Sequence, residues 1–161
     1  MEHIVQAVRI VDVMNLAEKE KLADELFRTQ PNIFASVLIQ NKLGTSYEDL
    51  DHLLNILFKC FMAVQTAGLN IPTISEETQD ICLARIAGRA RFIEGLSAGM
   101  VSKATQDQVN NHGEYNLLTL VMNELTNHRT FQVQTDADKS FLLTALNIVE
   151  TIAYIANDIK Y

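Results

Sequence analysis

Carboxylate and imidazole side chains lie at helical spacing in two places along the chain. Asp49 precedes His52 by three residues and Glu124 precedes His128 by four, so each pair would share one face of a helix. Bundles that hold two metal ions use such pairs, as two Glu-x-x-His motifs with two further acids on facing helices. The two spacings here differ, and the chain contains no Glu-x-x-His. We therefore expect solvated side chains here, with no bound metal or other cofactor.

The stretch "NNHGEYN" places His112 and Glu114 beside a glycine, and an imidazole near a carboxylate can support acid–base catalysis. A nucleophile in a Gly-x-Ser-x-Gly frame is missing, and so is a glycine loop for phosphate. A helix start explains the same residues, with Asn111 or His112 before the helix and Glu114 in its first turn. A hydrolytic or metal-dependent enzyme using His112, Glu114 or His128 is therefore the third hypothesis, and no catalytic residue is assigned.

Two arginines, Arg85 and Arg89, lie one turn apart in "LARIAGRARFIEGLSAG", among small and apolar residues. At 100° per residue they border a stripe that would let another helix approach closely. The stripe consists of Ile81, Ala84, Gly88, Phe92, Gly95 and Gly99. An arginine in such a place needs an acceptor, since an unpaired buried charge is very costly. We expect ion pairs with Glu124 or Glu150, and the alternative is a bound anion or acidic ligand.

A glycine turn at Leu43, Gly44 and Ser46, followed by Leu50, has the spacing of a helix-turn-helix. Its second helix would present three carboxylates between residues 48 and 51 to DNA, with no Lys or Arg to balance them. The sequence therefore indicates two packed helices sharing a turn, and no nucleic-acid partner.

Capping signals divide the chain into helices. Ser46 and Ser75 are predicted N-caps, and Gly44 and Gly68 are predicted helix ends. Helices are expected over residues 4–14, 17–28, 31–43, 47–67, 76 onward, 114–128 and 137–158. Residues 98–113 follow no clear pattern, and residues 130–134 alternate as a short extended connector would. We predict a single all-α domain over residues 1–161, a compact helical bundle of about six to eight helices.

Composition limits the classes of partner. The net charge of −7 disfavours nucleic acid and anionic membranes, since their phosphates need clustered Lys and Arg. The chain starts without the basic region of a signal peptide, and the apolar stretch 53–64 is too short to span a bilayer. The two cysteines, Cys60 and Cys82, sit in apolar surroundings as small buried residues, and a disulfide between them stays open. We expect a cytoplasmic protein without a membrane partner.

Apolar surface leads to the first functional hypothesis. The segments Ile56–Val64 and Phe141–Ile159 are apolar on more than one face. A single core is not expected to bury all of this apolar surface, so some of it is expected to form an interface. This pattern favours a non-enzymatic interaction or regulatory protein, acting as a homodimer or with a protein partner. The alternative is a regulatory domain that binds a small molecule or anion in an interhelical pocket lined by Arg85 and Arg89.

Overall fold

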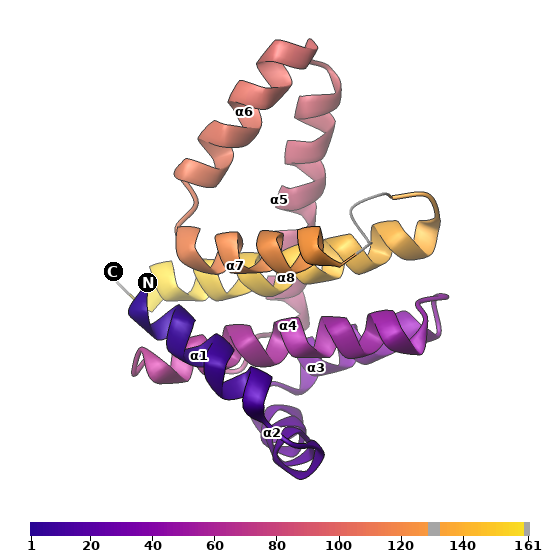
Figure 1. Ribbon diagram of the computed structural model, residues 1–161. Helices are drawn as coiled ribbons and strands as arrows, with labels where there is room; N and C mark the ends of the chain where they lie inside the picture. The colour runs from indigo at the N-terminus through magenta and orange to yellow at the C-terminus, as the bar shows by residue number, and fades with distance from the viewer. Residues whose placement is uncertain (129–132, 160–161) are drawn as a thin grey trace.

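The computed structural model describes residues 1–128 and 133–159, without the side chains of 92–94, 98 and 157–159. Within these residues the chain forms eight α-helices, one short 3₁₀ helix and no strand (Figure 1). In chain order they are α1 (Glu2–Val13), α2 (Leu16–Thr29), α3 (Pro31–Leu38), the 3₁₀ helix η1 (Ile39–Asn41), α4 (Tyr47–Thr66), α5 (Glu76–Glu94), α6 (Ala98–Asn110), α7 (Tyr115–Asn127) and α8 (Asp136–Ile159). The predicted all-α bundle is confirmed. Residues 98–113 form mainly α6, and the expected connector at 130–134 lies largely outside the described residues.

The helix boundaries follow local chemistry. Oγ of Ser46 accepts a hydrogen bond from the third residue of α4, and Oγ of Ser75 does the same for α5. These bonds satisfy backbone donors that a helix start leaves free. Gly44 and Gly68 have φ values of +104° and +71°, which side-chain-bearing residues rarely adopt. The predicted caps at Ser46 and Ser75 and the stop at Gly68 are confirmed. The helix expected over 31–43 ends earlier, because α3 stops at Leu38 and η1 and a turn lead to Gly44.

Helices α4 and α8 form the centre of the bundle. Helices α1, α3 and α7 contact α4, whereas α5 and α7 contact α8. Figure 1 shows α7 and α8 side by side, with α1 crossing α4. Most side chains between Ile56 and Val64 are buried, and the buried positions of α8 extend from Phe141 to Ala156. The apolar surface expected to be in surplus is thus used within the chain, and a dimer interface would need other residues.

One described helix, α8, is apolar and long enough over Asp136–Ala156 to cross a membrane. Of the 18-residue apolar stretch within this segment, 56% is buried inside the fold. A central helix of a helical bundle meets the same length and composition test. The burial accounts for the apolar composition of α8.

Helices α5 and α6 project from one side of the bundle, meet at the projecting tip and lie apart where they reach the bundle (Figure 1). The predicted six-residue stripe does not lie on one helix, because α5 ends at Glu94 and Gly99 belongs to α6. Ile81 and Gly88 face solvent, and a Cβ placed on Gly88 would meet no atom within 4 Å. The side chain of Phe92 lies outside the described ones. The expected close helix contact along this stripe is therefore wrong within the chain.

Candidate functional site

The two carboxylate–imidazole pairs come together where the start of α4 meets the end of α7. Nε2 of His128 donates to Oδ1 of Asp49 at 2.6 Å, and Nε2 of His52 donates to the backbone carbonyl of Glu124 at 3.2 Å. The two imidazoles stack with ring centroids 4.0 Å apart. His128 and Asp49 are only 15% and 14% exposed, so the expectation of solvated side chains is wrong here.

This cluster of two imidazoles and their acceptors links the start of α4 to the end of α7. Among the residues that the structure describes, no group of three or more His, Cys, Asp or Glu is placed to hold a metal ion. Burial lowers the pKa of His52, and the neighbouring His128 imidazole lowers it further. A neutral His52 imidazole stacked on His128 packs as a flat, half-buried ring with its Nε2–H satisfied. The arrangement explains how α4 and α7 are held together.

Lys59 is a buried cation that the sequence patterns missed. Its Nζ lies 2.8 Å from Oε1 of Glu124 and 2.9 Å from Oδ1 of Asp12, so it links α4 to α7 and α1. Its side chain is only 8% exposed. Glu124, expected as an acceptor for an arginine, pairs with this lysine instead. The signal was the lone lysine in an otherwise apolar stretch, since a buried cation needs a carboxylate partner.

Arg89, Glu150 and His112 form a second network, between α5, α8 and the α6–α7 loop. Nη2 of Arg89 donates to Oε1 of Glu150, which confirms one of the two predicted acceptors. Nε2 of His112 donates to Oε2 of the same carboxylate at 3.1 Å. The backbone N–H of Glu114 donates to Nδ1 of His112 at 3.0 Å. These bonds assign the imidazole as the neutral tautomer with its proton on Nε2.

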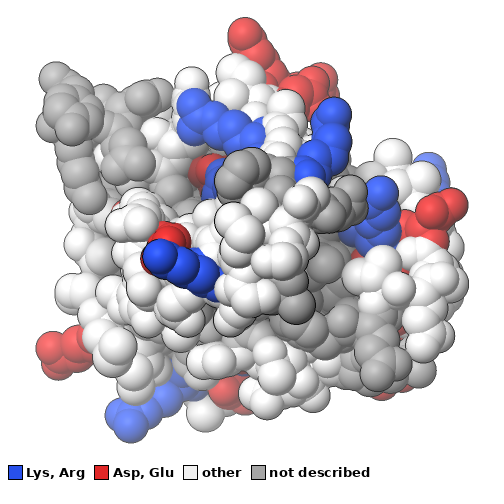
Figure 2. All heavy atoms as spheres, turned by 90° about the horizontal axis from the view of Figure 1, so that it is seen from above, with Lys and Arg blue, Asp and Glu red and all other residues white. Residues whose placement is uncertain are grey.

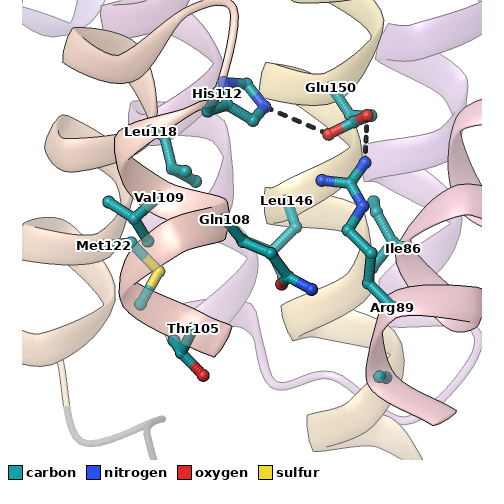
Figure 3. Close-up of a pocket in the computed structure, with 11 residues that line it drawn as sticks. Ile86, Arg89, Thr105, Gln108, Val109, His112, Leu118, Met122, Leu146 and Glu150 are labelled. Carbon is teal, nitrogen blue, oxygen red and sulfur yellow. Dashed lines mark hydrogen bonds and ion pairs between the residues drawn. The ribbon is translucent and has the colours of Figure 1, made fainter. Parts of the chain in front are cut away.

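Glu150 carries the charge that balances this network. Burial raises the pKa of Glu150, but hydrogen bonds from His112 and Arg89 outweigh burial and hold it below its ordinary value. The carboxylate is therefore ionised at neutral pH, although its side chain is only 12% exposed. Figure 3 shows Arg89 and His112 pointing at Glu150 from two different parts of the chain.

Arg85, one turn before Arg89, has a different environment. Its side chain is exposed, and its guanidinium carbon lies 4.7 Å from the centroid of the Tyr154 ring. Among the described residues it makes no ion pair with a carboxylate. The predicted ion pair is thus present for Arg89, and the described carboxylates supply none for Arg85. Among the described groups, the face of the Tyr154 ring is what lies opposite the Arg85 charge.

A partly open cavity of about 230 Å³ lies beside this network, lined by residues of α5, α6, α7 and α8. We call it the aliphatic cavity, because its walls are mainly Ile86, Ala90, Val109, Leu118, Met122 and Leu146. Thr105, Gln108, Arg89, His112 and Glu150 supply its polar positions (Figure 3). Mostly apolar walls with a few placed polar groups are typical of small-molecule sites.

A second hollow, of about 280 Å³, adjoins the aliphatic cavity and shares four of its residues. The shared residues are Arg89, Gln108, His112 and Glu150. The second hollow adds Arg85, Asn111, Gly113, Ala153 and Tyr154, and we call it the arginine mouth. Both arginines singled out in the sequence therefore line the arginine mouth.

No protein family, no curated protein and no solved structure matches the chain. The site is therefore interpreted from its own geometry.

The three residues considered as alternatives for an enzyme lie at the two ends of α7. His112 lies before α7 and His128 directly after it, so the thirteen residues of α7 separate them by about 20 Å. Glu114 is the N-cap residue of α7 and binds His112 only through its backbone N–H. Both ring nitrogens of His112 are engaged, which leaves no free base to accept a proton from a substrate.

Both cysteines are free and buried, so the disulfide left open by the sequence is not formed. Burial raises the pKa of Cys60 to about 12 and that of Cys82 to about 11. The thiolate is the reactive form, so neither side chain is suited to nucleophilic chemistry in the folded protein. The prediction that they act as small buried residues is confirmed.

Proposed function

We propose that this chain is a non-enzymatic, small-molecule-binding protein whose ligand occupies the aliphatic cavity. The observation that carries the proposal is an aliphatic hollow placed against a fixed hydrogen-bonding network, Arg89–Glu150–His112, contributed by three parts of the chain. A site of this kind combines apolar burial for affinity with a few polar groups for orientation. The engaged His112 imidazole favours binding over acid–base catalysis.

A plain alcohol tests this proposal, because it needs only the aliphatic walls. We expect 1-octanol to bind saturably, at one site per chain, by isothermal titration calorimetry, and to raise the melting temperature. Each buried methylene contributes about 0.8 kcal/mol, so an eight-carbon chain is long enough for measurable affinity.

Filling the cavity should abolish the binding. Leu146→Phe adds volume on the cavity wall, whereas Leu38→Phe makes the same exchange at a position on α3 that is 43% exposed. We expect loss of octanol binding in the first variant alone. Unchanged binding in Leu146→Phe would place the ligand elsewhere and contradict the proposal.

The exposed face of α5 favours a second candidate function, self-association. Ile81 is 37% exposed and Gly88 has open space above it, so a helix of another copy has room to approach closely. We propose a homodimer at micromolar concentration, measured by sedimentation equilibrium. Gly88→Leu should weaken the dimer, and Ser102→Leu on exposed α6 should not. A wild-type mass of 18.1 kDa at high concentration would exclude this candidate.

A further inference from the structure

The aliphatic cavity and the arginine mouth adjoin each other and share four lining residues. Gln108 is one of these four, and its amide lies between the aliphatic side chains and Arg89 (Figure 3). A ligand long enough to cross this boundary would have one end in each hollow. The chemistry of the mouth then determines which head group the site accepts.

The mouth has one more positive than negative charge. Arg85 and Arg89 supply two cations, Glu150 supplies one anion, and the His112 tautomer is neutral. Glu150 already neutralises Arg89, which leaves the Arg85 charge without a carboxylate among the described residues. This local excess stands out in a chain whose net charge is −7. Figure 2, which looks down on the side where α5 and α6 project, shows basic and acidic side chains interspersed, with no broad patch of either sign.

The donors of the mouth also fit a planar anion. The hydrogen bond from Arg89 to Glu150 uses Nη2, and its other guanidinium nitrogens have no partner among the described residues. Arg85 presents a complete guanidinium group beside it. A carboxylate matches the flat fork of N–H donors on a guanidinium better than a cation or a neutral hydroxyl does.

We propose that the two hollows form one site for a medium-chain carboxylate, with the alkyl chain in the aliphatic cavity and the carboxylate at Arg85. This inference rests on the proposed function, because it adds a head-group preference to ligand binding in the aliphatic cavity. Arg85 is the specificity-determining residue, and Arg89 positions the wall of the mouth through its ion pair with Glu150. The alkyl chain supplies affinity by apolar burial, and the carboxylate replaces water at an exposed cation.

Three ligands with the same eight-carbon chain separate the head group from the chain. We expect octanoate to bind the wild-type protein about tenfold more tightly than 1-octanol. A factor of this size is what one charge-assisted hydrogen bond adds to the affinity. We expect octylamine to bind more weakly than 1-octanol, because its ammonium would meet the uncompensated positive charge. Dissociation constants are measured by calorimetry on the full chain. Acetate, which lacks the octyl chain, measures the affinity of the carboxylate head group alone.

A matched pair of variants assigns the preference to Arg85. Arg85→Gln should bring octanoate to the affinity of 1-octanol and leave octanol binding unchanged. Arg91→Gln, an exposed arginine on the same helix, should retain the tenfold preference.

The possible outcomes distinguish the two proposals. Equal affinity for octanoate and 1-octanol in the wild type, or a preference that survives Arg85→Gln, would overturn the head-group inference while leaving the cavity as a binding site. Failure of every octyl compound to bind would overturn the proposed function itself.

Discussion

Replacing Lys59 by methionine is expected to destabilise the fold at neutral pH. Its ammonium group lies in the middle of α4, 8% exposed, within 2.9 Å of carboxylates on both α1 and α7. Methionine keeps the apolar stem of the side chain and removes only the charge. The perturbation therefore measures what the ion pairs contribute to holding three helices together.

The size of the effect follows from the exposure of the two acids. Removing one partner of a fully buried ion pair lowers the free energy of unfolding by about 3–5 kcal/mol, and removing an exposed ion pair lowers it by about 0–1 kcal/mol. Asp12 is 55% exposed and regains water, whereas Glu124 is 20% exposed and regains little. We therefore expect Lys59→Met to lower the free energy of unfolding by about 2–3 kcal/mol, most of it from the stranded Glu124 carboxylate.

Urea denaturation at pH 7 measures this difference, with Lys103→Met as the control at an exposed lysine. The double variant Lys59→Met/Glu124→Leu should regain most of the lost stability, because no buried charge is then left unpaired. If Lys59→Met alone were as stable as the wild type, the ion pairs of Lys59 would not stabilise the fold, and this prediction would be wrong.

The pH dependence of the Lys59 contribution has a definite sign. Burial lowers the pKa of Lys59, but hydrogen bonds and charge attraction from Glu124 and Asp12 outweigh burial and raise it above its ordinary value. A raised pKa in the folded state stabilises the fold fully below the pKa of the unfolded chain, about 10.4. The stabilisation is lost as the pH rises through the folded-state value. The wild-type advantage over Lys59→Met should hold at neutral pH and diminish in strong alkali.

Two further predictions concern the other buried groups. Arg89→Met should lower the free energy of unfolding by about 1–2 kcal/mol in urea at pH 7, since Arg89 is 34% exposed and Glu150 retains His112. Because the pKa of Glu150 is lowered by folding, this difference should shrink as the pH falls below the ordinary glutamate value, and a pH-independent difference would contradict the assignment. Cys60 and Cys82, with pKa values of about 12 and 11, should resist an aromatic disulfide reagent at pH 8 until urea unfolds the chain, and rapid reaction of the native protein would show that they are accessible.

The helices could be predicted because their signals are local. Ser46 caps a backbone donor three residues away, and Gly44 and Gly68 adopt conformations that depend on their own missing side chains. The stripe on α5 failed for the opposite reason. Periodicity alone does not say which face of a helix meets the bundle, and Gly88 lies on the face that meets solvent.

The candidate site was predicted in part. The need of Arg89 for an acceptor follows from its apolar surroundings, and Glu150 was one of two carboxylates named for it. The choice between Glu150 and Glu124 depends on which helices become neighbours. Arg89 pairs with Glu150, 61 residues away, and Glu124 pairs with Lys59, 65 residues away. Neither the cavity nor the tautomer of His112 is encoded in a spacing. The cavity depends on how α5, α6, α7 and α8 meet, and the tautomer depends on the contacts of His112 with Glu150 and Glu114.

Arg85 and Arg89 are equivalent in the sequence and differ in the structure, and this difference determines what each can do. Arg89 is committed to Glu150, a buried carboxylate that would be left with only a neutral imidazole if the arginine were removed. Among the described groups, Arg85 has the face of Tyr154 opposite its charge, and it is exposed at the mouth. If a ligand took Arg89 away from Glu150, the fold would lose stability, because the buried acid would lose its partner. In the proposed site, selectivity for an anion therefore falls to Arg85.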